Sequence, residues 1–296
     1  MRRIAIIVPT IRPENYKDFI KAWTPLFEKH NVHLFTVYDG ADPVVEYEGK
    51  KFTVPEVMGK HADTIYNFNS GVRNVGFALA YKLIKPDMYL TLDDDEVPDG
   101  DTIQDHIDIL NKRVPVSWIS TASEYMRGFP YGIRDEAEVV LSHGIWQGFA
   151  DWDAPTQLVM GNRPVTFYKG PIPKGILFPM CIMNLAFKPQ VLPWIFQPPQ
   201  GEKVGIWRFD DMWSGILTKR AIDENGWAAV TGYSSVVHQR ASNVWTNLKH
   251  EGTGLQLHET FWQGDESDPF FTIYRQKLAR WQEFLKEHVQ SRTTVF

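Results

Sequence analysis

The chain has 296 residues, of which 43% are hydrophobic and 23% are charged, as in a globular protein that buries a sizeable core. The net charge of −5 argues against a nucleic-acid binder that works by bulk electrostatics. A single cysteine, Cys181, excludes an intramolecular disulfide and fits a reducing compartment.

The first predicted elements form a β-α-β unit. Residues 4–8 are a continuous apolar run ended by Pro9 and Thr10, the pattern of a central strand in a parallel sheet. This run is too short for a signal peptide or a membrane span, so we expect a cytoplasmic protein. A helix over about residues 14–30 and a strand over residues 32–38 follow, and the strand ends at Asp39. Open α/β sheets bind ligands at such strand ends.

A second helix and strand lead to three consecutive aspartates. Apolar residues recur at helical spacing after Ser70, a candidate N-cap, and Pro86 marks the stop. The alternating run at residues 88–92 predicts a buried strand, which is followed by Asp93, Asp94 and Asp95. A divalent cation that bridges these carboxylates to another anion, such as a diphosphate, would relieve their mutual repulsion. The alternative is a solvated acidic turn, and the triplet alone does not separate the two.

The second half of the chain differs in composition from the first. Many of the 19 prolines fall between Pro164 and Pro199, which predicts a loop-rich region. Residues 270–288 predict an aromatic amphipathic helix packed on the main domain, with Phe271, Tyr274, Leu278, Trp281 and Leu285 on its apolar face.

The region around the aspartates resembles the nucleotide-sugar-binding half of GT-A glycosyltransferases. In that family an Arg-Asn-x-Gly helix start, matched here by Arg73, Asn74 and Gly76, precedes an Asp-x-Asp (DXD) strand end. A cation in the first turn of a helix can hold a diphosphate, although Arg73 alone would read as a surface helix residue. The resemblance also implies that Asp39 binds the uracil or ribose, whereas Asp-Gly is otherwise a common turn.

The second half resembles the reversibly glycosylated polypeptides, the UDP-arabinopyranose mutases. The matching blocks occur in the family's order: RGFPY at 127–131, SHGIW at 142–146, DWDAPTQL at 151–158, IPKG at 172–175, LFPMC at 177–181, MNLAF at 183–187 and DDMW at 210–213. Two departures concern the first half. Glu96 stands where the plant proteins usually have cysteine, and residues 70–76 replace their cysteine-bearing segment.

The resemblance implies a cytosolic mutase, dependent on Mn²⁺ or Mg²⁺, that interconverts UDP-arabinopyranose and UDP-arabinofuranose, a sugar of cell-wall polysaccharides. It also implies self-glycosylation on an arginine in the motif matched by Arg127, with Arg134 matching the second arginine. The expected fold is α/β: a single GT-A-like, Rossmann-like domain with a mixed central sheet. We expect this domain over residues 1–250, divided into a nucleotide-binding half (1–110) and a sugar or acceptor half (111–250), with a helical extension over 251–296 packed on it.

Chemistry gives the predicted metal and catalytic residues separate roles. Asp93 and Asp95, with His238 as a third ligand, would hold Mn²⁺ against the leaving diphosphate, although His238 could equally be a core histidine. Arg127 is either a covalent acceptor or a diphosphate clamp, since its guanidinium stays protonated. Asp210 and Asp211 precede an apolar helix, so one could cap the helix while the other acts on the sugar's own O4.

Further residues are predicted to contact the substrate by their chemical type and place: Thr10, Arg12, Asp39, Arg73, Asn74, Asp94, His143, Trp146, Lys174 and Asn184. Alternatives stay open for several of them. Trp146 could fill the core, His143 could be held by packing or a backbone hydrogen bond, and Lys174 could be a solvated loop residue.

Three hypotheses of function follow. The first is the mutase. The second is a UDP-sugar-dependent glycosyltransferase with a separate acceptor, which could be a glycan, a protein or a modified nucleobase. The third is a non-catalytic UDP-sugar-binding partner of an active paralogue, against which the retained aspartates argue. We expect a homo-oligomer or an assembly with paralogues, with nucleic acid entering only as an acceptor.

Overall fold

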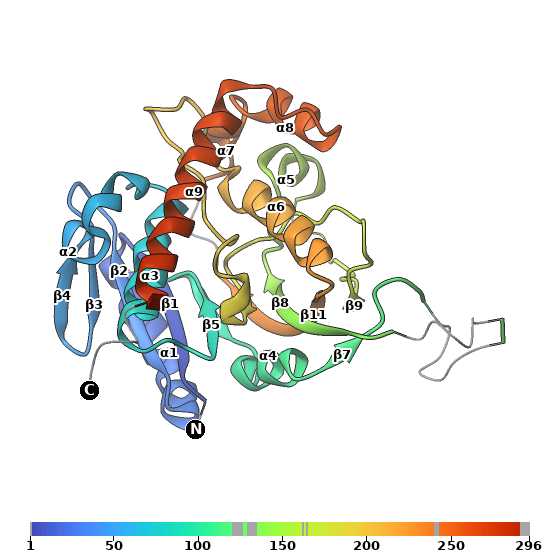
Figure 1. The fold of residues 1–296 in the computed structure, drawn as a ribbon, viewed down its shortest axis with the longest axis horizontal. Coiled ribbons are helices and arrows are strands. Elements are labelled where there is room, and N and C mark those ends of the chain that lie inside the picture. Colours follow the sequence, from blue (N-terminus) through green and yellow to red (C-terminus); the bar gives the residue numbers. More distant parts are fainter. Residues whose placement is uncertain are drawn as a thin grey trace.

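The computed structural model describes residues 2–119, 127–128, 135–161, 163, 165–239 and 243–290. A mixed β-sheet runs through the molecule in the order β4-β3-β2-β1-β5-β10-β8-β11-β6, with β7 added to β8 and β9 to β11. Helices cover both of its faces (Figure 1). The predicted α/β fold with a mixed central sheet is confirmed.

The N-terminal half of the sheet is parallel at its centre. Strand β1 (Ile4–Thr10) lies between β2 (His33–Tyr38) and β5 (Met88–Thr91), and both neighbours run parallel to it. The antiparallel strands β3 (Val44–Tyr47) and β4 (Lys50–Thr53) extend the sheet beyond β2. The carboxyl ends of β1, β2 and β5 therefore share one edge.

The second half of the sheet is joined through a short antiparallel strand. Strand β10 (Leu185–Phe187) pairs with β5 on one side and with β8 (Ala137–Gly148) on the other. Strand β11 (Ala228–His238) runs parallel to β8, and β6 (Glu96–Pro98) closes this side. The remaining pairs are two-residue strands, β7 (Arg113–Val114) and β9 (Gly170–Pro171).

Two hydrophobic clusters fill the two faces of the sheet. Along β1, Ile6 points into one cluster with Phe19 and Trp23 of α1 (Pro13–His30), and α4 (Thr102–Leu110) covers the same face. Ile7 points into the other cluster, which α3 (Arg73–Leu83) covers. Burial on both faces explains the uninterrupted apolar run of this strand, because successive side chains alternate between faces.

The remaining helices lie around this framework. The α-helices are α2 (Val54–Met58), α5 (Ala154–Met160), α6 (Asp210–Glu224), α7 (Val244–Glu251), α8 (Leu255–Trp262) and α9 (Pro269–Gln290). The 3₁₀ turns are η1 (Gly59–Thr64), η2 (Ser70–Val72) and η3 (Pro189–Val191). Figure 1 shows α9 running from α8 to α3, so that it spans both halves of the molecule. None of the helices in the described ranges is long and apolar enough to cross a membrane.

The observed elements agree with most of the predictions. The C-terminal amphipathic helix is α9, and Phe271, Tyr274 and Trp281 are buried as predicted. The predicted N-cap at Ser70 is wrong: the side chain of Asn69 accepts from the Gly71 amide (2.8 Å), while the Ser70 hydroxyl turns to Asp210. Asn69 is the N-cap because its side-chain carbonyl reaches the backbone amide of Gly71, two residues later. The domain boundaries stay a prediction.

The packing of α9 predicts a large stability difference between two tryptophans. Trp281 is 0% exposed, stacks on Phe284 and donates its indole N–H to the Leu192 carbonyl (3.0 Å), whereas Trp245 is 66% exposed. We expect Trp281→Ala to lower the free energy of unfolding by about 3–5 kcal/mol. The control Trp245→Ala should change it by less than about 0.5 kcal/mol in the same urea titration. Equal effects would contradict the observed packing.

Candidate functional site

The predicted site residues of the first half meet at one edge of the sheet. Thr10 ends β1, Asp39 follows β2, and the triplet beginning at Asp93 follows β5. The Asp39 amide donates to the Thr10 carbonyl (2.9 Å), and the Leu92 amide donates to the Ile7 carbonyl (3.2 Å). Parallel pairing thus brings polar groups from distant segments together, as the β-α-β pattern predicts.

Two arginines and a threonine compensate the aspartate triplet. The Thr10 hydroxyl donates to Asp94 Oδ2 (2.7 Å), and Arg12 pairs with Asp94 and, at 3.5 Å, with Asp95. Arg73, only 3% exposed, pairs with Asp93. The repulsion expected within the triplet is therefore offset in part by the chain's own cations.

Burial raises the pKa of two acids in this loop, Asp93 and Glu96. Burial raises the pKa of Asp93 to about 6, against the opposing pull of Arg73. Burial, followed by the nearby Asp93, raises the pKa of Glu96 well above its usual range. Glu96 Oε2 accepts the Asp93 amide (2.8 Å) and Oε1 accepts the Trp146 indole N–H (3.1 Å). Glu96 thus anchors the loop that carries the triplet.

Two of the predicted metal ligands, Asp95 and His238, face each other beside the triplet. His238 Nε2 lies 3.9 Å from Asp95 Oδ2, while its Nδ1 lies 3.1 Å from the Phe149 carbonyl oxygen. Because a carbonyl only accepts, Nδ1 carries a proton, and Nε2 is the ring nitrogen that faces Asp95. A backbone carbonyl that orients the ring through Nδ1 is the usual second partner of a histidine that ligates a metal through Nε2.

A cavity of about 620 Å³ connects the triplet with the second half of the chain. Asn69, Ser70, Arg73 and Asp93 line its nucleotide side, and the other walls include His143, Trp146, Asp151, Cys181, Arg208, Asp210 and Asp211. The short contact between the Ser70 hydroxyl and Asp210 joins the start of α3 to the start of α6. The cavity therefore brings the DDMW acids to the same space as Arg73.

The two acids of this motif begin α6 but do not cap it. The N-cap is Phe209, which makes no side-chain cap bond, so the prediction of an aspartate N-cap is wrong. Both acids lie one step later, in the first turn, where the helix dipole stabilises negative charge. Burial, together with Asp210 and then Asp151, raises the pKa of Asp211 to about 8. A carboxyl with a pKa near 8 exchanges its proton close to neutral pH, so Asp211 can serve as an acid or as a base.

His143 lines the cavity, but its ring is held by protein groups. The Cys181 amide donates to Nε2 (3.3 Å), which leaves the proton on Nδ1 to donate to the Thr231 hydroxyl (2.9 Å). Burial lowers the pKa of His143 to about 3, so its ring is neutral. Asp39 is also held, since its Oδ1 accepts the amides of Gly40 (2.8 Å) and Phe68 (2.9 Å).

Other predicted site residues lie away from the cavity walls. Asn74 is buried and exchanges hydrogen bonds with the Gln197 backbone (3.0 and 3.1 Å). Asn184 accepts from His106 Nε2 (2.8 Å) and donates to the Ile145 carbonyl (3.3 Å). Lys174 and Arg127 are exposed and line neither this cavity nor the one described next. Arg134 lies outside the described residues.

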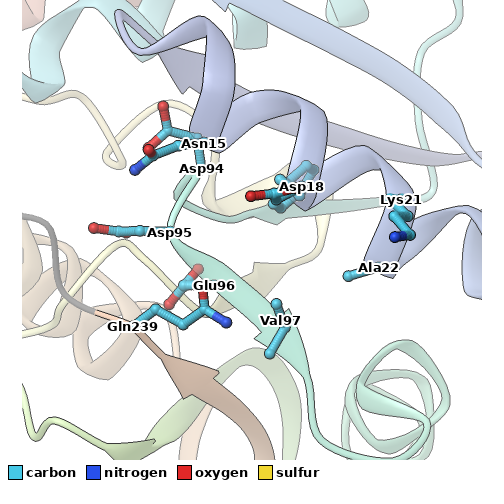
Figure 2. Close-up of a pocket in the computed structure, with 10 residues that line it drawn as sticks. Asn15, Asp18, Lys21, Ala22, Asp94, Asp95, Glu96, Val97 and Gln239 are labelled. Carbon is cyan, nitrogen blue, oxygen red and sulfur yellow. The ribbon is translucent and has the colours of Figure 1, made fainter.

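A smaller cavity of about 570 Å³ lies on the other side of the triplet. Figure 2 shows Asn15, Asp18 and Lys21 on α1 facing the segment from Asp94 to Val97. Its carboxylates are opposed by the single lysine Lys21 in this lining, so it is a poor place for a diphosphate. The larger cavity is also rich in acids, but its lining contains Arg73 and the predicted catalytic acids Asp210 and Asp211, so we assign the substrate to it.

The raised pKa of Asp211 predicts a pH-dependent effect of its replacement. A carboxyl with a folded-state pKa near 8 binds a proton that the unfolded chain has lost above about pH 4, so its burial destabilises the fold increasingly between these values. We expect Asp211→Asn to raise the urea midpoint relative to wild type at pH 8.5, with little difference at pH 5. The control Asp265→Asn, at a surface carboxyl whose pKa is lowered by Ser267, should give no gain at pH 8.5. A gain from Asp211→Asn at pH 5 equal to that at pH 8.5 would contradict the assignment.

Comparisons with known proteins agree with the sequence resemblance. UDP-arabinopyranose mutase 3 of Arabidopsis thaliana is 34% identical over 292 residues, covering 90% of this chain and 76% of the relative. UDP-arabinopyranose mutase 1 of the same plant is 34% identical over 298 residues, covering 90% and 78%. Among solved structures, glucosyl-3-phosphoglycerate synthase from Mycobacterium tuberculosis, in complex with Mn²⁺, uridine diphosphate and phosphoglyceric acid, has a TM-score of 0.44 at 11% identity, covering 96% of this chain and 78% of that one. The family model for reversibly glycosylated polypeptides matches residues 2–275, and the chain belongs to this family.

Proposed function

We propose that the protein is a UDP-arabinopyranose mutase that interconverts the pyranose and furanose forms of UDP-arabinose. The observation that carries the proposal is the cavity in which Arg73 and Asp93 face the same space as Asp210 and Asp211. If the diphosphate of a UDP-sugar binds beside Arg73 and Asp93, its sugar would lie toward Asp210 and Asp211. Membership of a family with curated mutases supports this substrate.

Ring contraction is an isomerisation in which UDP leaves and returns. The bond between C1 and the diphosphate oxygen breaks, and UDP takes the electron pair. O4 then attacks C1 and loses its proton, the C1–O5 bond breaks with its electron pair going to O5, and O5 gains a proton, before UDP attacks C1 again. The net change in protons is zero, which suits a single group that serves as acid and base. Asp211, with its pKa near 8, is our candidate for this group.

The leaving diphosphate needs a fixed cationic partner throughout this sequence. Arg73 Nε is buried and donates to no atom of the described residues, although the two Nη groups are engaged by Asp93, Thr91 and Ile182. That N–H is closed to solvent, so a diphosphate in the cavity would be held by the charge of the guanidinium. Asp93, Asp95 and His238 would hold Mn²⁺ or Mg²⁺, which supplies further charge stabilisation for the diphosphate when bound.

Arg127 keeps its proposed role as the site of self-glycosylation or as a second diphosphate clamp, with Arg134 as its partner. The exposed position of Arg127 means that either role requires an approach to the cavity. We also propose that the protein works in the cytoplasm, as a homo-oligomer or with paralogues.

A direct assay tests the mutase. We expect purified protein with Mn²⁺ to convert UDP-arabinopyranose into UDP-arabinofuranose, separated by chromatography, and to lose this activity after treatment with EDTA. Asp211→Asn should lower kcat at least about 100-fold if Asp211 moves both protons. Asp265→Asn, a surface replacement of the same kind, should leave kcat unchanged.

Two results would contradict the mutase. Slow release of arabinose and UDP without the furanose form would indicate a glycosyltransferase that lacks its acceptor. Binding of UDP-arabinopyranose without any turnover, whatever metal is added, would indicate a non-catalytic partner.

A further inference from the structure

Arg208 lines the same cavity and has an unusual backbone. Its φ is 69°, in the left-handed region that non-glycine residues seldom occupy. It directly precedes the N-cap of α6, so this turn sets the direction in which its side chain leaves the chain. Backbone strain of this kind persists where the surrounding contacts require it, and it is common at ligand sites.

The contact that holds Arg208 is made by a buried carboxylate. Arg208 Nε donates to Glu251 Oε1 (2.8 Å), and Glu251 is only 2% exposed. The other carboxylate oxygen, Oε2, accepts the backbone amide of Ala154 at the start of α5 (2.6 Å). Glu251 therefore fixes the plane of the guanidinium through one edge and is itself fixed by a second element.

The rest of the guanidinium faces the cavity. Within the described residues the Nη1 and Nη2 groups of Arg208 make no hydrogen bond, and the side chain is 37% exposed. Asp151 and Asp211 line the same cavity. Neither acid forms an ion pair with Arg208, whose partner among the described residues is Glu251. A rigid donor fork and nearby acceptors thus share one part of the cavity.

This combination of charges selects the kind of ligand group. A second phosphate would meet the carboxylates of Asp151 and Glu251 along with Arg208, and the negative charges would oppose it. Neutral hydroxyl groups instead accept from the guanidinium and donate to the carboxylates, so both kinds of protein group are satisfied. A pair of sugar hydroxyls fits such a site better than an anion.

We propose that Arg208 is a specificity-determining residue that binds the hydroxyl groups of the pentose, and that Glu251 is the positioning residue that orients it. This inference rests on the proposed function, because it takes the pentose of UDP-arabinose as the bound sugar. It assigns the diphosphate to Arg73 and the sugar hydroxyls to Arg208. The affinity for UDP alone should then be independent of Arg208.

Binding measurements separate these assignments. We expect Arg208→Lys to weaken binding of UDP-arabinopyranose at least about tenfold in calorimetry with Mn²⁺, because the ammonium cannot reproduce the fork, while UDP binds within about twofold of wild type. The matched control is Arg220→Lys, in α6, whose side chain is 32% exposed and pairs with Glu266 (2.6 Å) outside the cavity. It should leave both affinities unchanged.

Glu251→Gln tests the positioning role. We expect a KM for UDP-arabinopyranose raised at least about fivefold with kcat within about twofold, because binding shared by the ground state and the transition state is lost while the acid-base group remains. Unchanged UDP affinity would verify that this variant folds. Equal losses of UDP and UDP-arabinopyranose affinity in Arg208→Lys, or no loss of either, would overturn the inference. A wild-type protein that binds the sugar through Arg208 but forms no furanose would overturn the mutase alone.

Discussion

The buried ion pair between Arg73 and Asp93 is the contact on which the site depends. Arg73 also donates to the Thr91 hydroxyl (3.1 Å) and to the Ile182 carbonyl (3.3 Å), so one guanidinium joins α3, the end of β5 and a wall of the cavity. A buried pair of this kind contributes little net stability, but removal of either partner leaves an uncompensated charge. Its value here lies in placing a cation at a strand end that would otherwise be strongly negative.

Further contacts extend from this ion pair on two sides of the cavity. Toward β1, Arg12 and Thr10 hold Asp94, and His238 faces Asp95. Toward the second half, Ser70 contacts Asp210, which brings the first turn of α6 and its acids to the cavity. A nucleotide-binding edge common to α/β sheets is thereby joined to a group of acids that the loop-rich half supplies.

The sequence was most informative where local pattern determines geometry. The strand ends at Thr10, Asp39 and Asp93 could be placed together because parallel strands share their carboxyl edge. Asn74 and Asn184 show the opposite case. Their residue type suggests ligand contacts, but each amide is engaged by distant protein groups, Gln197 and His106 respectively. Pairings across such distances leave no local pattern.

The role of Arg208 could not be predicted from the sequence either, because it also depends on a contact with a residue far away in the chain. Its neighbours in sequence point only to the DDMW acids, whereas its role depends on Glu251, 43 residues later, and on a left-handed backbone. Cys181 is a similar case. Its sequence context predicts a small buried residue, and it is buried. Its thiol, however, also lies close enough to the carboxylates of Asp151 and Asp211 for the three groups to share a metal ion. Tertiary contacts decide both cases.

The central claim, that Arg73 holds the diphosphate while it neutralises Asp93, is tested most directly by UDP binding to Arg73→Lys. Lysine keeps a positive charge beside Asp93 but lacks the planar guanidinium, which spreads its charge over three nitrogens and holds Asp93, Thr91 and Ile182 at once. We predict that calorimetry will give a Kd for UDP at least about tenfold higher than wild type, with the near-ultraviolet circular dichroism of the folded protein retained. An unchanged Kd in a folded variant would contradict the account.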